Sequence, residues 1–253
     1  MPYIDWAKKI AYEGNVSIPP GAGDAERWGS AYDLALFEDG QKLPGLVLLA
    51  TVNLNFKWED GDEKSWETTE KKAFMNGFKT ECEKAWSDKF RITKDAPVPG
   101  LALGTSRTVP NSAGSYSVAR VAILINTVEQ WSNIGTHGTI TVYRETPKAK
   151  RIGVKDQRDV VFEKESLSLH TPSGGTKERR TVVHEFGHFL GYRDEYPGAD
   201  RGTSAYTGDS DSIMHRGDAV RERHYVFFAD WISERLNSSW KVEGLRNLSN
   251  TPL

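Results

Sequence analysis

Two kinds of spacing between hydrophobic residues recur along the chain. In Leu46–Trp58 an apolar run gives way to apolar residues at every second position, which is typical of a β-strand. Three later runs have a similar strand-like character: Tyr116–Thr127, Gly138–Arg144 and Val160–His170. In Trp66–Phe90 the apolar residues instead recur at steps of four, so we expect a long amphipathic helix there.

The second half of the chain is predicted to hold two more helices. The first is Lys177–Leu190, with Thr176 as its N-cap and Gly191 as a residue that turns the chain in a left-handed conformation. The second is Ala219–Asn237, which is amphipathic. The remaining segments are expected to be loops or a frayed tail: Gly14–Gly29, Asp95–Gly114, Tyr192–Gly217 and the residues after Trp240.

This order of elements predicts an α+β fold, with a twisted mixed sheet backed by two helices and followed by a smaller lobe. Residues 1–45 are expected to form an N-terminal extension that is partly loop. Residues 46–191 would form an upper subdomain of sheet and helices, and residues 192–253 a C-terminal subdomain. Together they would make one catalytic domain, for which 253 residues are sufficient.

Composition excludes several classes of function. The net charge is −2, and no long run of one sign marks a nucleic-acid-binding surface. The best apolar run, Leu43–Val52, is too short to span a bilayer, and Met1–Ile10 lacks the apolar core of a secretion signal. We therefore expect a protein made in the cytoplasm, whose export would follow a non-classical route. Cys82 is the only cysteine, so the chain forms no internal disulfide.

The chemistry is concentrated in the segment from His184 to His188. These two histidines are four residues apart on a predicted helix, so both imidazoles lie on one face and can reach a single Zn²⁺ ion. Glu185 lies at the edge of that face, where it can take a proton from a metal-bound water without being a ligand. Two histidines beside an unrelated glutamate would be the alternative interpretation.

The pattern continues beyond the helix. Gly191 is followed three residues later by Asp194, and Ser212-Ile213-Met214 lies downstream. This resembles the metzincin zinc peptidases, in which a glycine ends the site helix, a third ligand follows, and a Met-turn lies beneath the metal. Most metzincins have histidine where this chain has Asp194, but a carboxylate is also a zinc ligand. Arg216 stands where some of these families have a tyrosine.

The resemblance implies a zincin (metzincin-like) fold and a zinc-dependent endopeptidase. His184, His188 and Asp194 would hold Zn²⁺, Glu185 would be the general base, and Gly191 and Met214 would support the site structurally. An oxyanion donor is expected in His224 or Tyr225. The resemblance also implies a cleft whose upper edge strand pairs with an extended protein or peptide substrate, and we expect that strand in Val160–His170.

Two assignments stay open at this point. Glu195, and Glu222 on the following helix, are rivals for the third ligand, since Asp194 could instead pair with Arg193 or Arg201. The second open assignment is the role of His224. It falls on the apolar face of the last helix, with Val220, Phe227, Phe228 and Trp231. A core histidine with a buried hydrogen-bond partner therefore explains it equally well.

Three hypotheses about function follow. Asp194-Glu195-Tyr196-Pro197 and Arg223-His224-Tyr225 also resemble bacterial metallopeptidase domains, some of them associated with toxins and injection systems. That likeness favours an endopeptidase acting as a bacterial effector, with a secretion-system or immunity protein as partner. The second hypothesis is a metal-dependent amidase acting on a non-peptide or cell-wall amide. The third is a zinc-binding interaction module without turnover, against which the intact Glu185 argues.

Overall fold

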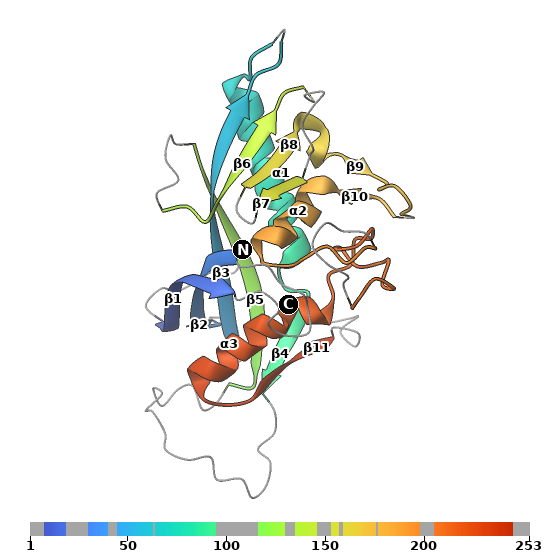
Figure 1. The fold of residues 1–253 in the computed structure, drawn as a ribbon. Coiled ribbons are helices and arrows are strands. Elements are labelled where there is room, and N and C mark those ends of the chain that lie inside the picture. The colour runs from blue at the N-terminus through green and yellow to red at the C-terminus, as the bar shows by residue number, and fades with distance from the viewer. Residues whose placement is uncertain are drawn as a thin grey trace, which may run out of the picture.

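The computed structural model describes residues 8–18, 30–39, 45–62, 64–94, 116–129, 135–145, 153–156, 159–175, 177–197 and 205–244. Within these ranges the chain forms a curled mixed sheet with three α-helices, so the predicted α+β class is confirmed (Figure 1). None of the described helices is both long enough and apolar enough to cross a membrane.

Strand β3 (Leu46–Glu59) organises the sheet. It pairs in parallel with β5 (Val118–Val128) along most of its length. On its other side the first half pairs antiparallel with β2 (Ser30–Glu38), and the second half pairs in parallel with β6 (Gly138–Tyr143). The start of β3 is buried on both faces of the sheet, because alternate residues belong to two separate apolar clusters, which explains the continuous apolar run there.

Shorter strands extend the sheet in both directions. Beyond β6 come β8 (Asp159–Glu163), in parallel, and the antiparallel strand β7 (Gly153–Asp156). Beyond β5 come the antiparallel strands β4 (Phe90–Lys94) and β11 (Trp240–Gly244). Strand β1 (Lys9–Ile18) pairs antiparallel with β2, so described residues of the first 45 belong to the same sheet.

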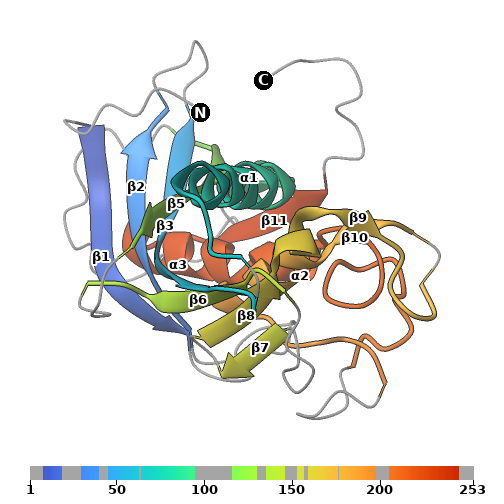
Figure 2. The same ribbon diagram turned by 90° about the horizontal axis from the view of Figure 1, so that it is seen from above.

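The helices carry the site. Helix α1 (Thr68–Trp86) packs on β5 and on α2 (Thr181–Phe189), and α3 (Val226–Leu236) packs on β11 (Figure 2). The face of α1 turned to the core carries residues at steps of four: Phe74, Phe78, Cys82 and Trp86. Cys82 is completely buried on this face.

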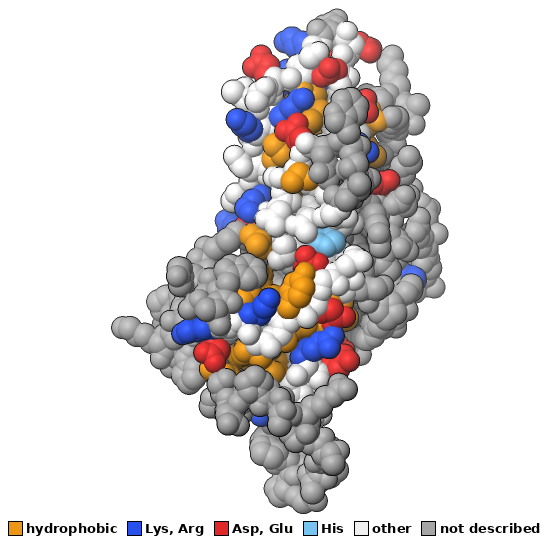
Figure 3. Space-filling view, turned by 90° about the vertical axis from the view of Figure 1, so that its left-hand side faces the viewer, with side chains coloured by type: hydrophobic (Ala, Val, Ile, Leu, Met, Phe, Trp, Pro, Cys, Tyr) orange, Lys and Arg blue, Asp and Glu red, His pale blue; other side chains and the backbone are white. Residues whose placement is uncertain are grey.

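The surface carries mixed charge. On the face of the molecule in Figure 3, the described residues show acidic and basic side chains interspersed.

Two predicted elements are shorter than expected. The predicted strand Val160–His170 is interrupted by the 3₁₀ helix η3 (Lys164–Leu167), after which β9 (Leu169–His170) leaves the main sheet and pairs with β10 (Arg179–Arg180). Because Arg179 and Arg180 are in that hairpin, α2 begins only at Thr181, with Arg180 in the N-cap position. The predicted N-cap, Thr176, lies outside the described residues.

The ends of the chain show the other differences. In the predicted helix Ala219–Asn237, residues up to Arg221 are not helical, Glu222–Tyr225 form the 3₁₀ helix η4, and α3 begins at Val226. The start of the predicted loop Gly14–Gly29 belongs to β1, and the start of the predicted frayed tail forms β11. Most of the predicted loop Asp95–Gly114 lies outside the described residues.

Candidate metal centre

Helix α2 holds the two histidines against the core. Its inner face buries Val182, Phe186 and Phe189, and the carbonyl of Val183 accepts a hydrogen bond from the indole of Trp86 on α1 at 3.0 Å. The imidazoles of His184 and His188 are buried, and their ring centroids are 5.2 Å apart. The helical spacing therefore places both rings together, as the sequence predicts.

Each of the two histidines has its Nδ1 atom beside a backbone carbonyl. The Nδ1 atom of His184 lies 2.7 Å from the carbonyl oxygen of Ile213, and that of His188 lies 2.6 Å from the carbonyl oxygen of Tyr192. A carbonyl can only accept, so the proton of His188 is assigned to Nδ1. Nδ1 of His184 also lies 2.8 Å from Nη1 of Arg179, which is a donor, so the contacts of this ring do not select one tautomer. A metal held by these residues would take the lone pair of each Nε2 and displace any proton there.

Asp194 faces both of these nitrogen atoms with one oxygen. Its Oδ1 atom is 3.0 Å from Nε2 of His184 and 3.6 Å from Nε2 of His188. Two ligand atoms on a tetrahedral zinc ion, each about 2.0–2.1 Å from the metal, are about 3.3–3.4 Å apart. The two observed separations bracket that value, and two imidazoles with one carboxylate are a zinc-type donor set, so these residues fit the metal.

Gly191 brings Asp194 back to the histidines. Its φ of 94° lies in the left-handed region that glycine adopts without a Cβ clash, which confirms the predicted turn. The amides of Gly191 and Tyr192 bond the carbonyls of His188 and Gly187 at 2.9 and 3.0 Å, closing the end of the helix. This turn also brings the Tyr192 carbonyl to His188.

Glu185 lies beside the two histidines. Its Oε2 atom is 3.7 Å from Nε2 of His188, and its side chain is 12% exposed. Donor atoms of His184, Glu185 and His188 all lie within 4.8 Å of one another, so this group could hold a metal ion. Glu185 would complete such a group by proximity alone, whereas Asp194 directs a single oxygen at both imidazoles.

The charges in the cluster are coupled. Burial opposes ionisation of Asp194, but hydrogen bonds from His184 and His188 outweigh it and lower the pKa of this carboxyl well below its usual range. Burial likewise opposes protonation of His188, yet Asp194 and Glu185 raise the pKa of its imidazole. A metal ion at this position would therefore compete with protons.

Arg179 is a part of the site that the sequence analysis did not find. Its Nη1 atom donates to the carbonyls of His215 at 2.7 Å and Ile213 at 3.2 Å, and lies 2.8 Å from Nδ1 of His184. Burial lowers the pKa of Arg179, but a guanidinium keeps its charge in proteins. Arg179, which lies on β10, therefore holds the Ile213 carbonyl that contacts His184. An arginine five residues before a histidine carries no sequence signal for this contact.

Met214 lies directly under α2. It is completely buried, and a Cβ atom added to Gly187 would lie 2.3 Å from its sulfur and 2.8 Å from Cζ2 of Trp86. Gly187 is thus required for the close approach of the helix to this turn. The Met214 carbonyl accepts the amide of Glu195 at 2.8 Å, so the same turn fixes the residue next to Asp194.

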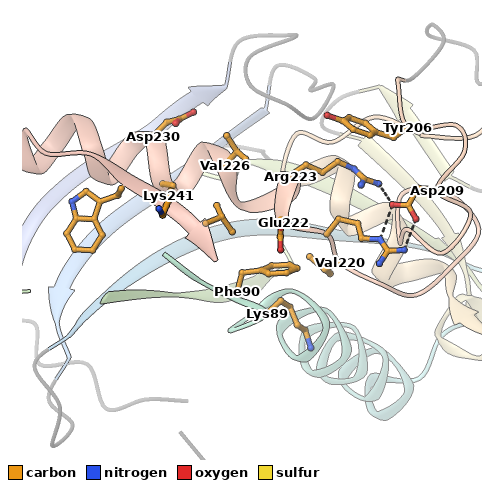
Figure 4. A pocket seen from close by; sticks show the side chains of 14 residues that line it. Lys89, Phe90, Tyr206, Asp209, Val220, Glu222, Arg223, Val226, Asp230 and Lys241 are labelled. Carbon is orange, nitrogen blue, oxygen red and sulfur yellow. Dashed lines mark hydrogen bonds and ion pairs between the residues drawn. The ribbon is translucent and has the colours of Figure 1, made fainter. Parts of the chain in front are cut away.

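Glu195, one of the two rival ligands, is turned away from the histidines. Its carboxylate makes two hydrogen bonds with the guanidinium of Arg223, at 2.8 and 2.6 Å, and its Oε1 atom is 3.4 Å from Nε2 of His224. Arg223 also bonds Asp209 at 2.8 Å, and Asp209 pairs with Arg221 (Figure 4). Burial alone would raise the pKa of Glu195, but Arg223 and His224 bring it down to about 2.

Glu222, the other rival, is exposed and lines a separate cavity of about 1060 Å³. Figure 4 shows its side chain beside Phe90 and Lys89, and none of the residues of the histidine cluster lines this cavity. Of the three carboxylates considered for the third ligand, Asp194 alone is in contact with both imidazoles.

The two expected oxyanion donors lie in the core, so this expectation is wrong in both cases. The ring of His224 is fully buried against Trp86 and Tyr192, and its Nδ1 atom accepts the amide of Arg221 at 3.1 Å. The hydroxyl of Tyr225 donates to the carbonyl of Trp86, and burial raises its pKa. Both side chains are therefore enclosed by the core and do not face solvent. The alternative interpretation of His224 as a core histidine is the correct one.

Comparison with models of protein families, with curated proteins and with solved structures found no match for this chain.

Proposed function

We propose that this protein is a zinc-dependent endopeptidase of the zincin (metzincin-like) type. One observation carries the proposal: Nε2 atoms of two buried histidines, each with its Nδ1 bonded to a backbone carbonyl, converge on one oxygen of Asp194. Histidines used only for packing have no need for two Nε2 atoms that converge on one carboxylate oxygen. This arrangement, with Glu185 beside it, is what metal-assisted hydrolysis requires.

In the proposed site His184, His188 and Asp194 hold Zn²⁺. When bound, the ion supplies a Lewis acid that polarises the substrate carbonyl and makes the attacking water more acidic. Glu185 accepts the proton of that water and passes it to the leaving amine, as general base and then general acid. Gly191 and Met214 support this geometry through the turn after α2 and the contact beneath it.

An extended substrate would pair with the edge of the sheet nearest α2. In the expected edge strand Val160–His170, the main-sheet part is wrong, because β8 is enclosed between β6 and β7. Among the described residues, β7 (Gly153–Asp156) is the outer strand on this side and packs near α2. We therefore assign the substrate edge to β7, whose outer backbone groups would bind an extended peptide main chain.

The proposal is tested with Glu185→Gln and the wild-type protein, measured on the same preparations. Bound zinc is determined by elemental analysis, and hydrolysis is assayed on casein, a peptide library and peptidoglycan, with and without a chelator. We expect the wild type to cleave peptides in a chelator-sensitive way. We expect Glu185→Gln to keep its zinc and its melting temperature while losing at least about 100-fold in rate, the lower range for a general base.

Each other result removes one part of the proposal. Cleavage of peptidoglycan without cleavage of peptides would identify the amidase hypothesis instead. Zinc binding without hydrolysis of any of these substrates would favour the interaction module. Loss of zinc from Glu185→Gln would make Glu185 a ligand and exclude it as the free base.

A further inference from the structure

We propose that Tyr196 is a positioning residue of this site, which makes Asp194 present a single oxygen to the metal. This inference rests on the proposed function. The hydroxyl of Tyr196 donates to Oδ2 of Asp194 at 2.9 Å. The other oxygen, Oδ1, is the one that faces the two imidazoles. The two oxygens of this carboxylate therefore have separate partners on opposite sides.

The division matters because a carboxylate can bind a metal through one oxygen or through both. A catalytic zinc site has three protein ligands and keeps its fourth position open for water or substrate. If both oxygens of Asp194 turned to the metal, the second would fill that position. A donor that holds Oδ2 prevents this, in the way that outer hydrogen bonds generally orient metal-ligating carboxylates.

Tyr196 is itself held by the turn that supports His184. Its ring packs edge-to-face on the imidazole of His215, with centroids 6.2 Å apart. The carbonyl of His215 accepts a hydrogen bond from Arg179, which also lies against His184. The intervening Glu195 is fixed by its amide to the Met214 carbonyl. The tyrosine is therefore seated on the same Ile213–His215 segment that fixes the first histidine.

The burial of the partners makes the contact effective. The side chain of Asp194 is 19% exposed, so water has little access to replace the phenol. Burial opposes the charge of this carboxylate, and each hydrogen bond it accepts offsets part of that cost. Removing the Tyr196 hydroxyl leaves the carboxylate free to rotate about χ2, so Oδ1 is no longer directed at the two histidines.

The test is Tyr196→Phe in the full chain, with Tyr12→Phe as the matched control, since Tyr12 is an exposed tyrosine on β1. Zinc dissociation constants are measured by competition with a chromogenic chelator. We expect Tyr196→Phe to bind zinc about 10–100-fold more weakly, the usual range for outer-shell partners, and to keep its melting temperature. Tyr12→Phe should match the wild type in both.

The same titration separates this inference from the proposed function. A wild-type protein that does not bind zinc would refute the proposed function. A wild type that binds zinc, with Tyr196→Phe binding it equally well, would refute only the role of Tyr196. Equal zinc affinity with a lower kcat at saturating zinc would make Tyr196 a group that contacts substrate. A Tyr196→Phe protein that fails to fold would show a packing role and overturn the inference too.

Discussion

Asp194 and Glu195 are adjacent in the sequence and have opposite surroundings in the structure. Asp194 faces the Nε2 atoms of two histidines. Glu195 faces a guanidinium that is always charged, and His224 donates to it from behind. The groups that meet each carboxylate therefore decide which of the two is suited to bind a metal, and adjacent residues can differ completely in this respect.

The two clusters also differ in their balance of charge. In the arginine cluster, Arg221 and Arg223 match Asp209 and Glu195 one to one. In the histidine cluster, two carboxylates, Asp194 and Glu185, face one permanent positive charge, the guanidinium of Arg179. The arginine cluster is complete without an ion, whereas the histidine cluster keeps negative charge that a divalent cation can neutralise.

The largest effect should come from removing the carboxylate of the histidine cluster. We expect Asp194→Ala to weaken zinc binding by more than about 100-fold, because even outer-shell partners of zinc ligands are worth about 10–100-fold. Affinity is measured by competition with a chromogenic chelator. Glu195→Ala and Glu222→Ala are the matched controls, since each removes a carboxylate that was a rival for the third ligand but does not face the imidazoles.

The controls decide whether the comparison holds. Folded Glu195→Ala protein should bind zinc nearly as well as the wild type, although less of it should be folded. If Glu195→Ala or Glu222→Ala reduced zinc affinity more than Asp194→Ala, the third ligand would have been assigned to the wrong carboxylate. The metzincin-like assignment would then be incorrect.

The next effect concerns the arginine cluster and its dependence on pH. The folded-state pKa of Glu195 is about 2, below its ordinary value of 4.5, so its contribution to stability is complete above pH 4.5 and is lost as the pH falls towards 2. Glu195→Gln removes that contribution at every pH. Because breaking a buried ion pair costs about 3–5 kcal/mol, and Arg223 keeps Asp209 as a partner, we expect a loss of about 3 kcal/mol at pH 6.

The measurement is urea unfolding of both proteins between pH 6 and pH 2.5. The difference in unfolding free energy between wild type and Glu195→Gln should shrink steadily as the pH is lowered. Glu222→Gln, which changes an exposed carboxyl outside the cluster, should follow the wild type throughout. A difference that stayed constant with pH would show that Glu195 stabilises the fold by packing and not by its charge.

The features predicted correctly from sequence depend on local spacing. The site histidines, the glycine turn and the core face of α1 each follow from residues within a few positions of one another. The central strand β3 is also predicted correctly, because its start is buried on both faces of the sheet and therefore has an uninterrupted run of apolar residues. In each of these cases the residues that form the sequence pattern are also the residues that make the structural contact or turn.

The features missed depend on partners far away in the chain. The carboxylate of Glu13 on β1 accepts a hydrogen bond from the indole of Trp231 on α3. Strand β1 is therefore held by a contact that no local sequence pattern predicts. The sequence predicts an oxyanion donor in His224, but in the structure Trp86 and Tyr192 pack against its ring. Helix α2 starts late because β10 pairs with β9, a contact that propensity alone cannot indicate.

The smallest effect should come from the glycine that joins the two clusters. Met214 contacts Gly187 through its sulfur and bonds Glu195 through its carbonyl. Alanine at Gly187 gains about 1 kcal/mol of helix propensity, but its Cβ would lie 2.3 Å from that sulfur, and overpacking costs about 1–3 kcal/mol. We therefore expect a net loss on the order of 1 kcal/mol, which lowers the melting temperature by about 2–4 °C.

Gly77→Ala on α1 is the matched control for this prediction. Its Cβ would meet only the flexible end of Leu167, at 3.1 Å, so the gain in helix propensity should dominate and the melting temperature should stay level or rise. Calorimetry of both variants compares the same chemical change in two helices. Because Met214 packs against α2 at Gly187, next to His188, Gly187→Ala should also weaken zinc binding, while Gly77→Ala should leave it unchanged. Equal behaviour of the two variants would show that Met214 yields freely, and that the histidine and arginine clusters are not coupled through it.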